Sequence, residues 1–507
     1  MKDTACVFHK FLNSAMKILY LIPIIGSILY LFLLHDENIL FSSFCFFTAF
    51  ILIGVTYYGL KNNYKKSLIV SIILISAFSI RILWFYSMDS IPIGDFNRMF
   101  ICAREYLDGS TYMFKDYSYF ARFPHMSITV LYFSLIMKIF SNSLIAIRFI
   151  NIVFSMLNII LLFFISKQIF KEQKKSIWVL LISSIYPPMI FYNNVYCSEN
   201  LAIPLLLLSI LLFFKATNMN NQNKFLFISI SGLSLSVMHL FRPLGYIMII
   251  AYTMYIFIYF KEKIKTKICV NLLLIVTFIL PFIIVSYMLM VLNITNNPLW
   301  HGTEPISMSV LRGTNIESGG AWNQEDADLA DKYEGDYESL DKAAKEIIKQ
   351  RLTTAPKIEL LCFYVLKYAK QWWIGDFGGV YWSQIGLSEA YNKEDYLDIM
   401  GKDEGRMLIK LNNDMQIYAQ IFYIAVSTLS FIGLWKNKKI INYKIDFFYI
   451  MFCGISLQCL LTESQARYTY PFSWIFIILA MTAFSENDIS NNSDMKINSR
   501  GEENGKF

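Results

Sequence analysis

Charged residues are scarce in this chain of 507 residues: they make up 16% of it, whereas soluble domains carry about 25%. Hydrophobic residues make up 56% of the chain. This composition excludes a soluble globular protein and predicts an all-α bundle that crosses a membrane many times. Helices suit such a bundle because each one satisfies its own backbone hydrogen bonds in lipid.

Patterns typical of metal sites and disulfide frameworks are also missing. The eight cysteines form no Cys-x-x-Cys pair, and the five histidines show no metal-ligand spacing. We therefore interpret the cysteines as small apolar residues. The formal charge of +7 resides mostly in lysines of short loops, where it indicates membrane topology. No nucleic-acid partner is expected.

Apolar runs recur along almost the whole chain, and twelve of them are predicted to span the membrane. The first follows Lys2, Lys10 and Lys17 and precedes no small-residue cleavage site, so we expect a retained helix and not a cleaved signal. The predicted spans cover residues 18–34, 39–60, 67–87, 146–167, 176–193, 200–215, 225–241, 244–260, 267–292, 416–435, 445–462 and 470–484.

A further apolar run, residues 126–140, is too short to span easily, because a crossing needs roughly 20 residues. If this run lies in the membrane plane, the lysine-rich short loops all face one side, which the positive-inside rule identifies as the cytoplasm. We therefore predict in-plane helices in the first outer loop. Abundant Ile, Lys and Asn are typical of an AT-rich bacterial genome, so the expected location is the bacterial plasma membrane.

The order of these runs predicts five parts of the chain. The first is a cytoplasmic start with an extra transmembrane hairpin, and the second is a transmembrane core that contains a catalytic outer loop. An extracytoplasmic loop or lid, a group of C-terminal transmembrane helices and a disordered cytoplasmic tail follow. Their respective boundaries are 1–66, 67–292 with the outer loop at 88–145, 293–415, 416–484 and 485–507.

Asp95 is the predicted catalytic base. It follows Gly94 and begins a short amphipathic run, residues 95–107, which we predict to be a helix lying on the bilayer. A carboxylate at a helix start also caps free N–H groups and is stabilised by the helix dipole. A purely structural role therefore explains Asp95 equally well.

Polar residues near the membrane ends gather mostly on the predicted outer side. Arg242 and Arg467 suit a lipid phosphate, because a guanidinium binds phosphate through two parallel hydrogen bonds. Alternatively, each arginine reaches lipid headgroups or neutralises Glu199 or Glu463; Glu463 and Arg467 have the spacing of an intrahelical pair. The candidates are Asp89, Asp95, Arg98, Glu105, Arg122, His125, Arg148, Glu199, His239, Arg242, Glu463 and Arg467.

Four motifs, in this order, resemble the GT-C superfamily of polytopic membrane glycosyltransferases, near the protein O-mannosyltransferases and aminoarabinose transferases. They are Gly94-Asp95, Arg122-Phe123-Pro124-His125, the stretch from Tyr186-Pro187-Pro188 to Glu199, and Glu463-Ser464-Gln465-Ala466-Arg467-Tyr468-Thr469-Tyr470-Pro471. The resemblance runs from about residue 67 to residue 484. It departs from the mannosyltransferase pattern where Phe96, not glutamate, follows Asp95.

The resemblance implies an inverting glycosyltransferase that takes a sugar from a polyprenyl-phosphate carrier in the membrane lipid. The acceptor would be a glycan, lipid or protein of the cell envelope, on the extracytoplasmic side. Asp95 would deprotonate the acceptor, Glu199 would orient the acceptor or a basic neighbour, and a divalent metal is possible. The residues expected to bind substrate are Glu199, Arg122, His125, Arg242, Glu463, Arg467 and Tyr468.

Two other functions remain open at this point. A transporter of lipid-linked glycans fits the number of spans, but we find neither a repeat of two halves nor a matched pair of broken spans. A polymerase or ligase of lipid-linked oligosaccharides would also carry outer arginines. An Asp95 variant that is folded but inactive would favour the glycosyltransferase.

Overall fold

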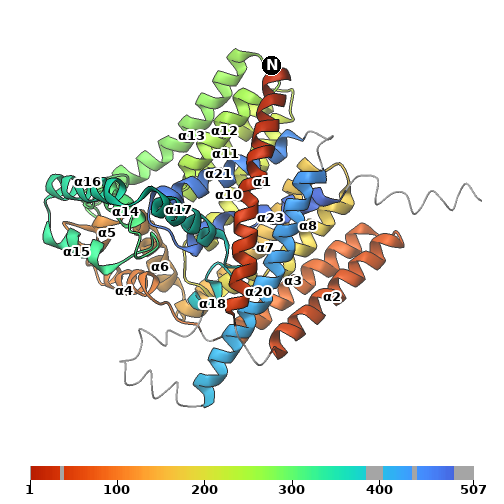
Figure 1. Cartoon of the computed structure of the whole chain (residues 1–507), viewed down its shortest axis with the longest axis horizontal. Helices are drawn as coiled ribbons and strands as arrows, with labels where there is room; N and C mark the ends of the chain where they lie inside the picture. Colours follow the sequence, from red (N-terminus) through yellow and green to blue (C-terminus); the bar gives the residue numbers. More distant parts are fainter. Residues whose placement is uncertain (1, 35–38, 89, 384–402, 437–441, 485–507) are drawn as a thin grey trace, which may run out of the picture.

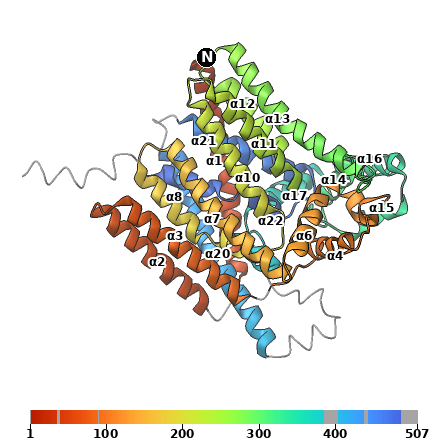
Figure 2. The same ribbon diagram turned by 180° about the vertical axis from the view of Figure 1, so that it is seen from behind.

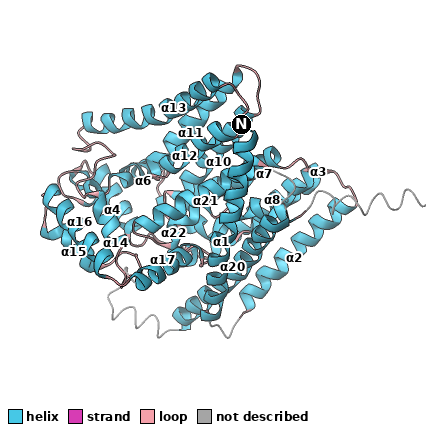
Figure 3. Cartoon of the chain, turned by 45° about the horizontal axis from the view of Figure 1, so that its top comes forward, coloured by secondary structure: helices cyan, strands magenta, loops and turns pink. Residues whose placement is uncertain are grey.

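The structure is a computed structural model that describes residues 2–34, 39–88, 90–383, 403–436 and 442–484. Within these ranges every regular element is a helix (Figure 3). The predicted all-α membrane architecture is therefore confirmed. Figure 1 labels the elements in chain order.

Nine helices of the described chain are long and apolar enough to cross a membrane. They are α1 (Lys2–Leu33), α2 (Leu40–Lys61), α3 (Lys66–Ser87), α7 (Ser143–Ile169), α10 (Glu199–Thr217), α11 (Asn223–Phe241), α13 (Ile264–Val291), α20 (Asp403–Lys436, apolar from Asp414) and α21 (Tyr443–Leu461).

The other three predicted spans are shorter or broken. Residues 176–193 form α8 (Gln173–Ile185), followed by α9 (Pro187–Phe191) and η3 (Tyr192–Asn194) at an angle of 56°. The break coincides with a pair of prolines, which lack the N–H that continues a helix. Residues 244–260 form the 14-residue α12 (Gly245–Ile258), and 470–484 are divided among η4 (Tyr470–Phe472), α23 (Ile475–Ala480) and η5 (Met481–Ala483). The count of twelve spans therefore stays a prediction.

The first outer loop consists of short helices. They are α4 (Asp95–Leu107), η1 (Tyr112–Phe114), α5 (Tyr119–Arg122), η2 (Pro124–Met126) and α6 (Ser127–Ile139). α6 packs against α4, and the chain turns by 114° between α5 and the segment that begins at Pro124. A sharp turn of this kind fits the prediction that α6 lies along the membrane surface, which stays a prediction.

The second large polar segment contains α14 (Ile306–Gly313), α15 (Gln324–Lys332), α16 (Tyr337–Thr354), α17 (Lys357–Trp372) and α18 (Gly379–Trp382). In Figures 1 and 2, α14 to α16 lie beside α4 and α5 at one side of the molecule. Two backbone hydrogen bonds attach this segment to the chain after α21: Glu463 N–H to Ser309 O (2.8 Å) and Ser464 N–H to Gly320 O (2.9 Å).

The first two helices join the bundle at different places. α1 packs against α17, α20 and α21, whereas α2 packs against α3, α8 and α20. At the centre of the bundle, α10 packs closely against α7 and α11. The main buried core is aromatic and aliphatic, and the exposed faces of α2, α3 and α13 are rich in large apolar side chains. Such faces suit contact with lipid tails.

Candidate active site

Asp95 lies at the first position of α4, and its carboxylate points away from its own helix. Gly94, just before it, has φ 55°, a conformation that glycine adopts without steric cost. Among the described residues, the carboxylate contacts Tyr119, whose hydroxyl donates to Oδ1 at 2.6 Å, and Arg467. The side chain does not serve as an ordinary helix cap. This leaves the carboxylate, which is 39% exposed, available to the cavity beside it.

Arg467 sits between two carboxylates without a close bond to either. Its Nη2 lies 3.8 Å from Asp95 Oδ2, and its Nε lies 4.0 Å from Glu199 Oε1. The guanidinium also lies over the rings of Phe96 (4.8 Å) and Trp382 (4.7 Å). Burial disfavours its charge, but the facing Glu199 and Asp95 carboxylates hold the pKa of Arg467 above its usual value. The group therefore remains a cation.

Glu199 is the buried acid of this cluster. It begins α10, is fully buried, and binds Nη2 of Arg242 through Oε1 at 2.7 Å. Arg242 follows the end of α11, so two spanning helices contribute to this ion pair. The structure thus brings Asp95, Glu199, Arg242 and Arg467 together from four separate parts of the chain.

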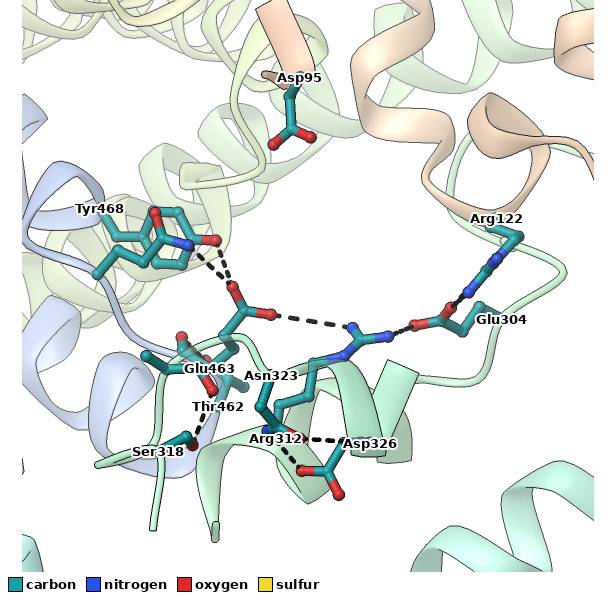
Figure 4. Close-up of polar contacts among 12 residues, drawn as sticks. Asp95, Arg122, Glu304, Arg312, Ser318, Asn323, Asp326, Thr462, Glu463 and Tyr468 are labelled. Atoms are coloured by element: carbon teal, nitrogen blue, oxygen red, sulfur yellow. Dashed lines mark hydrogen bonds and ion pairs between the residues drawn. The ribbon is translucent and has the colours of Figure 1, made fainter. Parts of the chain in front are cut away.

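Glu463 belongs to a second polar network, shown in Figure 4, with the Asp95 carboxylate pointing toward it from the opposite side. Glu463 accepts a hydrogen bond from the Tyr468 hydroxyl (2.9 Å) and lies 3.9 Å from Arg312. Arg312 and Arg122 both bind Glu304, each at 2.7 Å. The network therefore joins the polar segment that contains α14 to α18, called the outer segment below, to the first outer loop and to the chain after α21.

The possible intrahelical pair between Glu463 and Arg467 does not form. Residues 462–465 lie in a non-helical turn between α21 and α22 (Ala466–Thr469). The spacing that suits a pair within a helix therefore does not bring these side chains together. Arg122 likewise uses its guanidinium on Glu304 and Asp331, the latter at 3.2 Å.

His125 lies in η2 and lines the cavity between these networks. Burial and the neighbouring Arg242 guanidinium lower the pKa of His125 to about 4. At neutral pH the ring is therefore uncharged. It could hold a phosphate by a hydrogen bond, but not by charge.

One cavity of about 1630 Å³ joins the two networks. Its lining includes Asp95, Arg122, His125, Arg242, Glu463, Arg467 and Tyr468. Glu199 lies behind this surface, in contact with Arg242 and Arg467. Of the other outer candidates, Arg98, Glu105 and His239 line the cavity, whereas Arg148 donates to Met88 O (2.6 Å). Asp89 lies outside the described residues.

Four residues that complete the site were not among the sequence-based candidates: Tyr119, Glu304, Arg312 and Trp382. Tyr119 and Trp382 contact Asp95 and Arg467 directly, whereas Glu304 and Arg312 neutralise their neighbours. The sequence signal for Glu304 and Arg312 is that both are charged residues in the segment predicted to be a lid, residues 293–415. The sequence does not show which charges they would meet.

A divalent metal does not fit Asp95 and Glu199, the two acids beside Arg467. Asp95 and Glu199 both face Arg467, and Glu199 also binds Arg242, so cations of the chain already occupy their surroundings. In the described part of the chain, no group of three or more His, Cys, Asp or Glu side chains could hold a metal ion.

Comparisons with known proteins found one family model and similar solved structures. Residues 128–287, from α6 into α13, match the family model described as dolichyl-phosphate-mannose-protein mannosyltransferase. No curated protein sequence matches the chain. Two similar solved structures come from Archaeoglobus fulgidus, and this chain spans about half the length of each of those chains.

The first is the archaeal oligosaccharyltransferase AglB in complex with an inhibitory peptide and a dolichol-phosphate. It is 12% identical, with a TM-score of 0.44, and the alignment covers 86% of this chain and 52% of that one. The second is the apo form of the oligosaccharyltransferase of the same organism, 12% identical, with a TM-score of 0.46 and coverage of 82% and 50%. The family match over residues 128–287, in a helical chain with many apolar spans, confirms the resemblance to the GT-C superfamily of membrane glycosyltransferases.

Proposed function

We propose that this chain transfers a sugar from a polyprenyl-phosphate carrier to a cell-envelope acceptor, with inversion at the anomeric carbon. The reaction takes place on the extracytoplasmic side of a bacterial plasma membrane. One observation supports this most strongly: a partly exposed carboxylate, Asp95, and a buried guanidinium, Arg467, share one cavity and lie 3.8 Å apart. A base and a holder for a leaving phosphate are the two groups that this reaction requires.

In the proposed step, Asp95 takes the proton of the acceptor hydroxyl as the hydroxyl oxygen attacks the anomeric carbon. The bond between that carbon and the phosphate oxygen breaks, and its electron pair leaves with the polyprenyl phosphate. Arg467 and Arg242 stabilise the negative charge that grows on this phosphate. Because phosphate leaves as an anion, no acid is needed to protonate it, and one carboxylate suffices.

Two hydrogen-bond donors of Arg467 have no partner within the described chain and could bind such a phosphate. Within the described chain, its buried Nε and Nη1 atoms have no hydrogen-bond partner, and its two ion pairs are as long as 3.8 and 4.0 Å. A buried donor without a partner costs about 1–3 kcal/mol, so its presence in a cavity needs an explanation. A bound phosphate would satisfy these donors and recover that free energy.

Glu199 and Tyr119 position the two reacting groups in this proposal. Glu199 binds Arg242 at 2.7 Å and so neutralises one of the two phosphate-binding arginines before the donor arrives. Tyr119 fixes one oxygen of Asp95 and leaves the other facing Arg467. His125, Arg122, Glu463 and Tyr468 line the space around this centre and would contact sugar or acceptor.

The test uses membranes that contain the chain, together with polyprenyl phosphates that each carry one radiolabelled sugar. We expect label to pass from one donor to an endogenous envelope acceptor and to disappear with Asp95→Asn. Asp108→Asn, at the exposed far end of the same helix, is the matched control and should retain transfer. A polymerase, ligase or transporter would transfer no single sugar from any of these donors, and that result would refute the proposal.

A further inference from the structure

The opposite end of the bundle contains a second cavity, of about 690 Å³. It is bounded by the start of α1, the end of α7, the start of α8, the ends of α10 and α12, and the start of α21. This cavity shares no lining residue with the candidate active site. The chemistry proposed above makes no use of it.

The length of helix α10 gives the approximate distance between the two cavities. Its first residue, Glu199, belongs to the active-site cluster, and its last, Thr217, lines the second cavity. The 19 residues of α10 extend about 28 Å at 1.5 Å per residue, close to the roughly 30 Å thickness of a hydrocarbon core. The second cavity therefore lies at headgroup level on the opposite membrane face, at the lysine-rich end of the chain.

Lysines give this cavity an excess of positive charge. Lys171, Lys175, Lys261 and Lys444 line it, whereas the lining carboxylate of Glu262 already binds Lys224 at 2.5 Å. Asp446, in the wall behind, accepts hydrogen bonds from the Tyr259 hydroxyl (2.7 Å) and from His9 Nδ1 (2.8 Å). Its carboxylate oxygens are thereby bonded within the protein, and the four lining lysines outnumber the carboxylates beside them, so the cavity attracts an anion.

Two of these lysines, the buried Lys175 and the half-buried Lys444, donate hydrogen bonds to main-chain oxygens. Lys175 is 7% exposed and donates to Phe484 O at 2.8 Å, and Lys444 donates to Gln168 O at 2.7 Å. Over the residues that the structure describes, neither ammonium has a carboxylate within 4.0 Å. Buried charges are normally paired, and each ammonium has three donors. The pair is therefore built to receive acceptor oxygens from a ligand.

Aromatic rings surround the lysines, as is common where a protein meets lipid headgroups. Tyr259 and Tyr443 stack at 4.6 Å, and Phe170 and Phe260 complete the lining. We propose that this cavity binds the phosphate group of an anionic membrane lipid. Lys175 and Lys444 hold the phosphate, and Lys171 and Lys261 attract it from the rim. A basic pocket between helix ends is a known type of lipid headgroup site.

The test measures equilibrium binding of a fluorescent phosphatidylglycerol to the full chain in phosphatidylcholine vesicles. We expect saturable binding that weakens about thirtyfold in Lys175→Gln/Lys444→Gln, because each lysine near a lipid surface contributes roughly a fivefold gain. Lys263→Gln/Lys265→Gln is the matched control. Both of its lysines are exposed at the same end, outside the cavity, and affinity should change less than about twofold.

The exposed rim pair, Lys171→Gln/Lys261→Gln, keeps the proposal testable if Lys175→Gln/Lys444→Gln fails to fold, and it should also weaken binding. An equal loss in the cavity variants and the control would overturn the proposal, because it would show attraction by general surface charge. Competition is measured separately with inorganic phosphate. Binding of inorganic phosphate without saturable lipid binding would contradict the lipid as the source of the phosphate.

Discussion

Arg467 is held as a cation by carboxylates that it does not bind closely, and this feature is central to the proposed chemistry. In a short, bidentate ion pair, Asp95 and Arg467 would bind each other, so that the carboxylate could not act as a base and the guanidinium could not bind phosphate. The observed 3.8 Å keeps Asp95 and Arg467 coupled by charge, while two Arg467 nitrogens have no hydrogen-bond partner in the described chain. Arg242, in contrast, is committed to Glu199 at 2.7 Å. In the proposed reaction the two arginines would therefore have unequal roles in holding the phosphate.

His125 should make the fold sensitive to acid. Its pKa, lowered to about 4 by burial and by Arg242, lies below the unfolded value of about 6.5. Between these values the unfolded chain binds more protons, so the free energy of unfolding falls as pH drops from about 6.5 toward 4. We expect His125→Gln to lose less thermal stability between pH 7 and pH 5 than the unaltered chain, measured in detergent.

His301→Gln is the control for this experiment, since His301 is exposed in the same cavity. Its melting temperature should follow pH as that of the unaltered chain does. An unchanged acid sensitivity in His125→Gln would show that His125 is not neutral in the folded chain at the pH values tested.

At the scale of single residues, the sequence indicated which residues belong to the polar site better than it indicated which residues they contact. The motif around Glu463 and Arg467 was correctly singled out as polar and near a helix end, because charges are costly there. Spacing could not reveal that the helix breaks between them, so that Arg467 faces Asp95 and Glu463 faces Arg312. Partners such as Arg122 and Glu304 lie 182 residues apart in sequence, and periodicity carries no information over such distances.

At the scale of elements, a buried lysine of helix α17 joins the end of α14 to the end of α21. Lys367 Nζ donates to the carbonyl oxygens of Gly313 (2.6 Å), Thr462 (2.8 Å) and Leu460 (2.9 Å). Burial lowers the pKa of Lys367 to about 8, so the ammonium is still mostly charged at neutral pH. The ends of α14 and α21, and with them Glu463, are positioned by this side chain.

We expect Lys367→Met to reduce the free energy of unfolding by about 2–3 kcal/mol, because it leaves three carbonyl groups without a donor. The measurement is chemical or thermal unfolding of the purified chain, with tyrosine and tryptophan fluorescence as the signal. Lys357→Met, at the exposed start of the same helix, should differ from the unaltered chain by less than about 0.5 kcal/mol. Equal effects of the two substitutions would refute this role for Lys367.

Long, strongly apolar elements were predictable, whereas broken ones were not. Runs such as residues 146–167 and 267–292 became the continuous helices α7 and α13, because length and hydropathy alone suffice for a span. The run 470–484 is divided into three short helices, and no periodicity in the sequence indicates where such turns fall. Apolar composition therefore predicts burial in this segment, but not its local geometry.

At the scale of the whole molecule, polar residues separate into two groups at opposite helix ends. α10, α11 and α21 each run between the lysine-rich end and the candidate active site. The positive-inside rule assigns the lysine-rich end to the cytoplasm. The active site would then open outward, where a sugar bound to a lipid carrier meets envelope acceptors.

This orientation is tested with cysteines added one at a time to a chain whose exposed Cys269 and Cys362 are replaced by serine. Lys342→Cys lies on α16 of the outer segment, and Lys265→Cys lies on the exposed start of α13. In intact cells a membrane-impermeant thiol reagent should label the first and spare the second until the membrane is opened. The reverse pattern would place the active site in the cytoplasm.

The most direct test titrates the polyprenyl-phosphate sugar against the purified chain in vesicles and follows turnover. Asp95→Asn should lower maximal turnover at least about a hundredfold and leave the half-saturating donor concentration unchanged, because only a base is lost. Arg467→Lys should instead raise the half-saturating donor concentration about tenfold, because lysine cannot bind phosphate bidentately. Full turnover by Asp95→Asn, or an unchanged donor dependence in Arg467→Lys, would contradict the proposed pairing of base and phosphate holder in one cavity.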